Sequence, residues 1–367
     1  MRLWLVIAWL LVSDTAAAHK PNGARPAATD KWSDESCDDQ EPSTLVTAIE
    51  RELDVLRADP DATRVQHGRL KLSNLAYVEK LLLPIKHAAQ KGKRALCRLL
   101  QKKLELRKVA TGNAHVTAYY HPVLRGSRTA QGPFQVPLYR RPSDEKLVTE
   151  PTAAILDGAL QGQGLEILYV ETLAQALHIH IEGSATIAFE DGSEVNLTTD
   201  GHNGHPYQNP LRLLLKDKRI PDDFQPPPSQ SRTQAYVTAH PEVLREYWGK
   251  NPHFVFFKET LLRGTGKFGE LVAGRSIAID PKHVPMGALL LLKTQVATQN
   301  DDGTKQGTKT ARLVLAQDTG AAITGPLRVD LFVGSGEAAR VAAGHTNFPG
   351  ELLLVLPPRP RHSRRSH

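Results

Sequence analysis

The chain has 367 residues, of which 40% are hydrophobic, so it is long enough for two domains with buried cores. Its formal net charge of +7 includes four arginines in the last eleven residues, and the rest of the chain, at 7 − 4 = +3, is only mildly basic. Such a body suits an anionic polymer such as the cell wall. No helix combines a basic face with interleaved aromatic residues, so nucleic acid is not expected as a partner.

The first eighteen residues have the pattern of a secretory signal peptide. Arg2 precedes an apolar run from Leu3 to Val12, and Ala16-Ala17-Ala18 offers a small-residue cleavage site. The run is shorter than the about twenty apolar residues of a transmembrane helix, and no later segment is long enough. We therefore expect a soluble protein exported to the periplasm or cell-wall space, without a transmembrane segment. No cysteine directly follows the cleavage site, because the first one is Cys37, and this argues against a lipid anchor.

Cys37 and Cys97 are the only cysteines, so a zinc site built on CxxC pairs is excluded. An oxidising compartment allows a disulfide between them, and two separate thiols are the alternative.

Helices are predicted after a polar segment, residues 19–42, that we interpret as a flexible leader. Leu45 to Leu56 has helical spacing, with Ser43 as the expected N-cap and Pro60 as the stop. A second helical region covers about 73–83, with Pro84 interrupting it. A third runs from Lys91 to Leu104, and its basic residues are interpreted as a solvated face.

From residue 115 the pattern becomes β-rich, with short β-branched and aromatic runs between glycines and prolines. Alternation predicts a strand over Leu177–Ile181, and the run 186–189 before Asp191-Gly192 indicates half of a hairpin. A helix with a break at His240-Pro241 is predicted over 234–248. Further strands are predicted at 275–279, 289–292, 313–316, 329–333 and 352–356.

The segment from Gln317 to Asp330 holds the best candidate for a catalytic acid. It places Asp318 and Asp330 on two β-like runs joined by glycines. Because Val329 and Leu331 alternate with Asp330, the carboxyl can point away from the packed face of a strand. The alternative is a structural ion pair between Asp330 and Arg328.

Several motifs in the same order carry a resemblance to a known family. The blocks are Thr117–Pro122 with Gly126–Arg128 and Pro137–Pro142, Glu182–Ser184, Asn203–Tyr207, Asn251 with Phe254–Lys258, Ala273–Ser276 with Pro285–Gly287, and Gln317–Asp330. Together they resemble the lytic murein transglycosylase A family, with a C-terminal 3D-type domain. Residues 19–110 carry no comparable motif.

This resemblance implies the architecture. We expect a mainly β protein with N-terminal helices, in which residues 43–121 and 259–356 form a double-psi β-barrel domain. A second β domain, residues 122–258, is inserted, and a glycan strand would lie in a groove between the two. Residues 357–367 would be a basic, disordered tail, and the protein is expected to be a monomer.

The resemblance also implies the chemistry. The protein would be a lyase, a peptidoglycan lytic exotransglycosylase that cleaves the MurNAc-GlcNAc β-1,4 bond and leaves 1,6-anhydromuramyl products; the residues alone leave exo and endo action open. Asp330 would be the single acid and base, supported by Asp318, with no cofactor and no metal. The residues expected to bind the glycan are Thr117, Tyr119, Glu182, Ser184, Asn203 and His205.

Three positions depart from the family pattern. Glu182 stands in place of Gln, Ala118 in place of Gly, and Ala321 in place of a second Gly. An extra carboxylate at Glu182 would either repel an anionic glycan or act as a second catalytic group.

Two other functions fit parts of the sequence. His178 and His180 would share one face of the predicted strand, and with His202 and His205 they could bind zinc in a metal hydrolase. A non-catalytic β-barrel that binds peptidoglycan is the other alternative.

Overall fold

The computed structural model describes residues 32, 37–58, 65–67, 70–72, 74–221, 230–266, 269–299, 305–320 and 322–357. The signal peptide, most of the leader, Ala321 and the basic tail after Pro357 lie outside the described residues. Among the described helices, none is long and apolar enough to cross a membrane.

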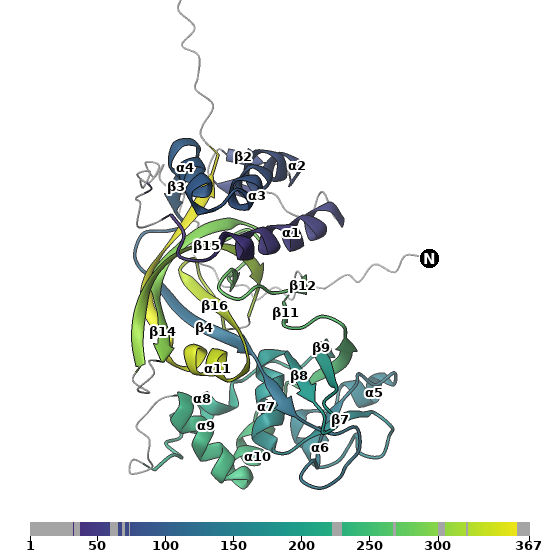
Figure 1. Ribbon diagram of the computed structural model, residues 1–367. Coiled ribbons are helices and arrows are strands. Elements are labelled where there is room, and N and C mark those ends of the chain that lie inside the picture. The colour runs from purple at the N-terminus through teal and green to yellow at the C-terminus, as the bar shows by residue number, and fades with distance from the viewer. Residues whose placement is uncertain are drawn as a thin grey trace, which may run out of the picture.

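The described residues form a mainly β protein whose larger unit is a closed barrel of six strands (Figure 1). Around the barrel the strands follow the order β14-β15-β13-β16-β4-β17, and β17 pairs back to β14. Of the six pairs of neighbouring strands in the barrel, β13–β15 and β16–β4 are parallel, and the other four are antiparallel. The strands are β4 (Ala114–His121), β13 (Ser276–Ala278), β14 (Leu289–Gln299), β15 (Lys305–Asp318), β16 (Arg328–Ser335) and β17 (Asn347–Leu356).

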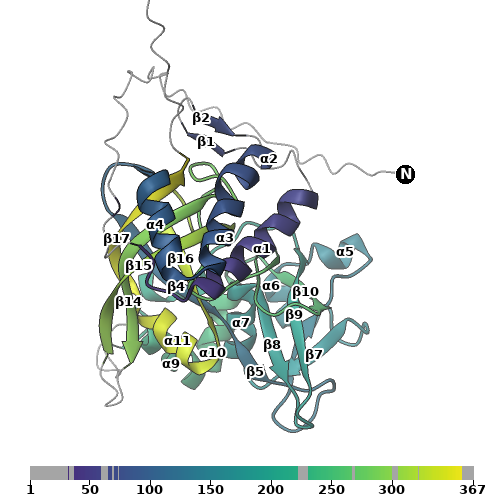
Figure 2. The same cartoon turned by 45° about the horizontal axis from the view of Figure 1, so that its top comes forward.

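Helices from the N-terminal part of the chain cover one side of the barrel (Figure 2). They bury leucines and isoleucines such as Leu45, Ile49 and Ile85 in one core with the barrel strands. The helices are α1 (Pro42–Ala58), α2 (Asn74–Tyr77), a π-helical turn (Val78–Leu82), α3 (Leu83–Gln90) and α4 (Lys93–Lys103). Short strands complete this part of the chain: β1 (Val65–His67), β2 (Leu70–Leu72) and β3 (Glu105–Lys108), which pairs antiparallel with the end of β17.

Three predictions for this region need correction. Pro84 does not interrupt the helix, because it lies in the first turn of α3, directly after the π-helical turn, where proline is tolerated. Helix α1 begins at Pro42, one residue before the expected N-cap Ser43. The leader is also shorter than predicted, since Asp38 forms an ion pair with Arg275 in which both side chains are fully buried.

The predicted disulfide is confirmed. Cys37 is bonded to Cys97, with the two Cα atoms 5.3 Å apart. The bond joins the segment before α1 to α4, and the chain-entropy account of a loop of 60 residues gives it about 4 kcal/mol of stabilisation.

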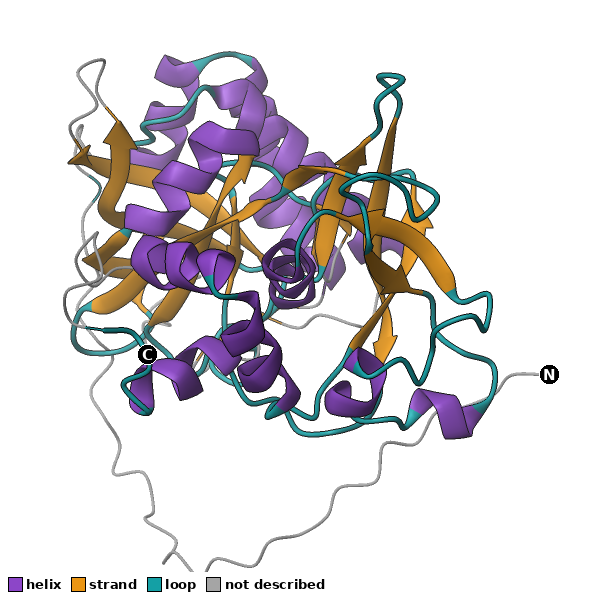
Figure 3. Ribbon diagram, turned by 90° about the horizontal axis from the view of Figure 1, so that it is seen from below, coloured by secondary structure: helices purple, strands orange, loops and turns teal. Residues whose placement is uncertain are grey.

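The second unit lies between β4 and the later barrel strands in sequence and has its own core. Figure 3 shows the helices and strands of the molecule from below. A four-stranded sheet runs in the order β10-β9-β8-β5, and β6 pairs with β7. Its strands are β5 (Val123–Arg125), β6 (Val136–Tyr139), β7 (Glu166–Val170), β8 (Ser184–Ala188), β9 (Glu194–His202) and β10 (Val255–Thr260). Its helices are α5 (Glu145–Val148), α6 (Thr152–Leu156), α7 (Leu173–Glu182), α8 (Pro210–Lys216), α9 (Gln230–Ala239) and α10 (Pro241–Gly249).

Within this unit one strand prediction is wrong and two other predictions are confirmed. Residues Leu177–Ile181 belong to helix α7, not to a strand. The hairpin after residue 186 is present as β8 and β9, and the helix break at His240-Pro241 separates α9 from α10. The chain then returns to the barrel through β11 (Thr265–Gly266) and β12 (Gly269–Glu270), and α11 (Gly336–His345) follows β16.

Candidate active site

Asp318 and Asp330 are brought together by the strand register. Ala278 of β13 is paired with Asp318 on one side and with Asp330 on the other, and Asp330 is in turn paired with Thr117 of β4. Directly paired residues of neighbouring strands share one face of a sheet. The alternate residues Val329 and Leu331 are fully buried on the opposite face, as the sequence predicted. A polar row therefore crosses four strands, with the small Ala278 between the two carboxylates.

Asp330 is held by a hydroxyl. Thr117 Oγ1 donates to Asp330 Oδ1 at 2.5 Å, and Arg328 Nη2 donates to Thr117 Oγ1 at 2.8 Å. The guanidinium of Arg328 also donates to the Val329 carbonyl, so it reaches Asp330 through Thr117. Burial raises the pKa of Asp330, and the charge of Asp318 adds to this, whereas the bond from Thr117 and the charge of Arg328 lower it; the net shift is upward.

Two donors converge on Asp318. The hydroxyl of Tyr119 donates to Oδ2 at 2.9 Å, and the backbone N–H of Thr319 donates to Oδ1 at 2.8 Å. Burial and the nearby carboxylates raise the pKa of Tyr119 well above its usual value, so its hydroxyl keeps its proton. The Tyr119 ring lies 5.4 Å from that of Phe332. A Cβ on Gly266 would lie 2.8 Å from Asp318 Cγ, so the β11–β12 hairpin can approach Asp318 only with glycine there.

Glu182 brings a third carboxyl to the same region. It is the last residue of α7, and its side chain is 15% exposed. Burial raises the pKa of Glu182 to about 8, and Asp330 and Asp318 contribute to this shift. The histidine one turn earlier, His178, places Nε2 3.8 Å from Glu182 Oε1.

Ser184 and His121 fasten the end of β4 to the inserted unit. Both are buried, and the Nδ1 of His121 lies 3.1 Å from the hydroxyl of Ser184. The other ring nitrogen, Nε2, lies 2.9 Å from the hydroxyl of Thr186. The hydroxyl of Ser184 is thus engaged with His121.

Asn203 and His205 lie in the loop after β9, where their polar atoms contact backbone groups of the inserted unit. The amide nitrogen of Asn203 donates to the carbonyls of Glu150 and Pro252, and His205 Nε2 lies 2.9 Å from the carbonyl of Thr149. These contacts order the loop. Two residues further on, burial raises the pKa of Tyr207, and Glu182 adds to this shift.

The histidines do not assemble as the zinc alternative required. Because Leu177–Ile181 is helical, His178 and His180 point in different directions. His178 packs on Tyr120, and His180 is enclosed by the rings of Trp248, Phe254 and Phe257. Within the described parts of the chain, no group of three or more histidines, cysteines, aspartates or glutamates is placed to hold a metal ion.

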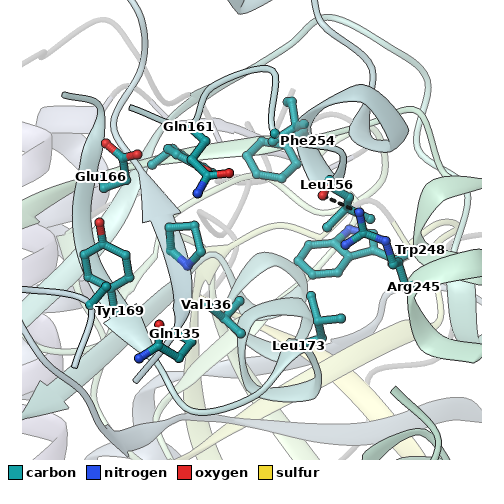
Figure 4. Close-up of a pocket in the computed structure, with 15 residues that line it drawn as sticks. Gln135, Val136, Leu156, Gln161, Glu166, Tyr169, Leu173, Arg245, Trp248 and Phe254 are labelled. Atoms are coloured by element: carbon teal, nitrogen blue, oxygen red, sulfur yellow. Dashed lines mark hydrogen bonds between the residues drawn. The ribbon is translucent and has the colours of Figure 1, made fainter. Parts of the chain in front are cut away.

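A pocket of about 390 Å³ lies inside the inserted unit, apart from the row that contains Asp330 (Figure 4). Tyr139, Tyr169, Trp248 and Phe254 form part of its lining. Arg245 at its wall is engaged with the Leu156 carbonyl and Asp157. None of the residues expected to bind the glycan lines this pocket.

Several residues of the site were not identified from the sequence. Ala278 lay in a predicted strand, and its role depends on pairings with strands far away in the chain. His121 and Tyr120 belonged to a recognised motif without an assigned role. The only signal for Arg328 was its proximity in sequence to Asp330.

Two family models match the chain. Residues 115–258 match the MltA specific insert domain, and residues 275–356 match the 3D domain. The insert match begins near the start of β4, and the 3D match covers β13 to β17. The barrel with its inserted unit therefore has the domain composition of a murein transglycosylase.

The curated relatives that the chain matches are also lytic murein transglycosylases. Membrane-bound lytic murein transglycosylase A of Vibrio cholerae is 32% identical over 265 residues, which cover 67% of this chain and 70% of that protein. The protein of the same name from Escherichia coli K12 is 32% identical over 248 residues, 66% of each chain, so the alignment spans just under two thirds of that relative. The chain belongs to the membrane-bound lytic murein transglycosylase A family.

Solved structures share the fold. The membrane-bound lytic murein transglycosylase from Agrobacterium tumefaciens superposes with a TM-score of 0.70 at 26% identity, covering 87% of this chain and 93% of that one. MltA of Escherichia coli with bound chitohexaose gives a TM-score of 0.72 at 23% identity, with 91% and 95% covered.

Proposed function

We propose that the protein is a peptidoglycan lytic transglycosylase in which Asp330 alone serves first as acid and then as base. The observation that carries this proposal is the setting of Asp330, a partly buried carboxyl held by Thr117 on the face that also carries Asp318. A carboxyl with a raised pKa keeps its proton at a pH where an exposed aspartate has lost it, as a general acid requires.

The reaction needs two proton transfers, one from Asp330 and a later one back to it. Protonated Asp330 gives its proton to the glycosidic oxygen as that oxygen leaves C1 of the muramyl sugar. The Asp330 carboxylate then takes the proton of the muramyl C6 hydroxyl, whose oxygen bonds to C1 and closes a 1,6-anhydro ring. Because the nucleophile is part of the same sugar, its effective concentration is high and no second carboxylate is needed to activate water.

The other expected residues extend the site along the glycan. Thr117, Tyr119 and Glu182 would line the position of the reacting sugar, and Ser184, Asn203 and His205 would order the inserted unit along the strand. The chitohexaose named for the Escherichia coli structure, a chain of β-1,4-linked amino sugars, supports a glycan as the ligand class.

The architecture expected from the sequence fits this function. The barrel would be a double-psi barrel formed by residues 43–121 and 259–356, with residues 122–258 as the insert, and its two parallel strand pairs support that assignment. The protein would act as a monomer outside the cytoplasm, without residues 1–18 and without a lipid anchor, although the named relatives are membrane-bound. The intact mass of the exported protein tests the last point.

The test is Asp330→Asn with isolated murein sacculi as substrate. Asn keeps the shape of the side chain but cannot deliver a proton, so release of soluble muropeptides should fall by about 100-fold or more with unchanged thermal unfolding. Mass spectrometry of the wild-type products should find 1,6-anhydromuramyl ends, one water lighter than hydrolytic ends.

The matched control is Asp318→Asn, which should lose less activity because Asp318 only sets the field around Asp330. Wild-type turnover by Asp330→Asn, or free reducing muramic acid in the products, would refute the single-acid mechanism. Binding to sacculi with no release of muropeptides by the wild type would favour the non-catalytic alternative.

A further inference from the structure

Glu182 is fixed beside the two aspartates by contacts between α7 and the end of β4. Upstream of it, the His178 ring packs against Tyr120 with the ring centroids 5.4 Å apart. Downstream of it, the hydroxyl of Ser184 is bound to His121, the last residue of β4. Between them, Gly183 ends the helix in the left-handed conformation, with φ at 73°. These two contacts fix the backbone on either side of Glu182.

The surroundings of Glu182 disfavour its charge. Burial comes first among the causes that raise its pKa to about 8, followed by Asp330 and Asp318. Its nearest basic neighbour, His178, cannot neutralise it at neutral pH, because burial and the charge of Arg340 lower the pKa of that ring to about 4. The Nε2 of His178 is buried without a hydrogen-bond partner.

Among the described residues, the further groups that interact electrostatically with Glu182 are carboxyls and tyrosines. The groups that interact with it electrostatically are Tyr119 and Tyr120 on β4, Asp318 on β15, Asp330 on β16 and Tyr207 after β9. Arg340 on α11 acts on Tyr120 and His178, but its guanidinium is committed to Glu337 of the same helix, with contacts at 2.6 and 2.7 Å.

We propose that Glu182 is a positioning residue of the lytic site that works as an uncharged carboxyl, offering one hydrogen-bond donor and one acceptor beside Asp330. This inference rests on the proposed function. In this state the site contains one fixed anion, Asp318, next to the acid. Glu182 does not touch the reacting bond. It acts by limiting the electrostatic cost of ionising Asp330 in the first step.

The charge state of Glu182 has a direct consequence for catalysis. When Asp330 gives up its proton, it becomes an anion close to Asp318. If Glu182 is also ionised, the new charge forms beside two anions instead of one, and the acid step becomes slower. Lytic activity should therefore fall as the pH rises through about 8, where Glu182 loses its proton.

The first experiment compares wild type with Glu182→Gln across the pH range, using muropeptide release from sacculi. Gln has the shape of a protonated Glu and keeps a donor and an acceptor, but it cannot ionise. With a pKa of about 8, the protonated fraction of Glu182 falls about tenfold between pH 7 and pH 9, so the ratio of variant to wild-type activity should rise, by as much as about tenfold where the ionised form is inactive. The control is Glu242→Gln on α10, whose side chain is 68% exposed and whose ratio to wild type should stay flat.

The second experiment measures the charge state without any substrate. Glu182 ionises near 4.5 in the unfolded chain and near 8 in the folded protein, so the folded protein holds the extra proton between these values. Wild type must then lose stability relative to Glu182→Gln as the pH rises from about 4.5 to about 8, with a constant difference above that. The melting temperatures of the two proteins over this range give the readout.

The outcomes are distinct. A rising activity ratio with a growing melting difference supports the proposal. If the difference in melting temperature grows with pH but the activity ratio is flat or falls, Glu182 is not a positioning residue. If the difference in melting temperature stays constant with pH, Glu182 is not uncharged at neutral pH. If wild type releases no muropeptides at any pH, the proposed function fails and the positioning role fails with it, while the melting comparison still decides the charge state.

Discussion

Thr117 shows how a single hydroxyl links a cation to the candidate acid. Its one hydrogen goes to Asp330 Oδ1, so its oxygen is left to accept from Arg328. The guanidinium thereby polarises the hydroxyl that holds the carboxyl, and it avoids a direct ion pair that would keep Asp330 ionised. From the sequence, the alternative to a catalytic Asp330 was an ion pair with Arg328. The structure places the Thr117 hydroxyl between the two side chains, which favours the catalytic interpretation.

We predict that Thr117→Val lowers the rate of muropeptide release by about tenfold, the value of one hydrogen bond to a charged group. Val matches Thr in shape, so the fold should persist while Asp330 loses its donor and its orientation. Initial rates near neutral pH, with thermal unfolding measured in parallel, check the prediction. Thr117→Ser, which keeps the hydroxyl, is the control and should retain most of the activity; equal rates for Val and wild type would show that the hydroxyl is not needed.

At the residue scale, the sequence predicted the direction in which the Asp330 side chain points but not which residues lie beside it. Alternation with Val329 and Leu331 is a local property, readable within five residues. The position of Ala278 between Asp318 and Asp330 is not local, because it depends on the register of three strands whose order in the barrel differs from their order in the chain. No short window of the sequence contains that information.

At the scale of elements, helix α1 is attached to the barrel by a buried polar network behind the site. Gln317, the neighbour of Asp318, donates to Glu52 Oε2 at 3.0 Å and accepts from the hydroxyl of Ser276 at 2.7 Å. The other oxygen of Glu52 is buried without a partner and lies where a Cβ on Gly287 would overlap it. Burial raises the pKa of Glu52 to about 7, despite the bond from Gln317.

This raised pKa predicts a pH dependence of stability. In the unfolded chain Glu52 ionises near 4.5, so the folded protein binds one more proton between about 4.5 and 7 and loses stability as the pH rises through that window. The loss attributable to Glu52 is at most about 3 kcal/mol. Glu52→Gln should remove it, and denaturant unfolding at pH 5 and pH 8 compares the two proteins. The stability of the variant minus that of wild type should be larger at pH 8 than at pH 5. An equal difference at the two pH values would contradict this assignment.

Helix α7 explains why one element was predicted wrongly. Over five residues, Leu177–Ile181 satisfies a period of two, and such a short window does not separate a strand from a helix. A helix signal lay just upstream, because Thr172 and Gln175 have the spacing of a capping box, which the structure contains. Extending the window to this start signal would have favoured the helix and placed Glu182 at its end.

For the whole molecule, the junction between barrel and insert depends on His121. The single hydroxyl hydrogen of Thr186 goes to Asn196 Oδ1, at 2.6 Å, so Thr186 accepts from His121 Nε2–H. The Nδ1 of the ring then accepts from the hydroxyl of Ser184. Burial, with Arg263, lowers the pKa of His121 to about 4, so this neutral arrangement persists at physiological pH. The sequence contained every residue of this junction, yet Ser184 and Thr186 lie 63 and 65 residues from His121, and only the folded chain pairs them.

We predict that His121→Phe loosens the insert while leaving the barrel intact. Phe fills the space of the ring but leaves the buried hydroxyl of Ser184 without its partner, at a cost of about 1–3 kcal/mol, whereas Thr186 keeps its hydrogen bond to Asn196. Because α7 is attached through Ser184, Glu182 should lose its fixed position, and muropeptide release should fall. Hydrogen exchange should accelerate in α7 and β8, with β14 and β15 as protected as in wild type.

A compensating variant separates this cause from simple overpacking. Combining His121→Phe with Ser184→Ala removes the unpaired hydroxyl together with its partner, a change that is close to neutral when shapes are kept. The combined variant should therefore be more stable than His121→Phe alone, as thermal unfolding can measure. If it is equally destabilised, the ring shape and not the hydrogen bonds holds the two units together, and the coupling of Glu182 to the barrel through His121 is wrong.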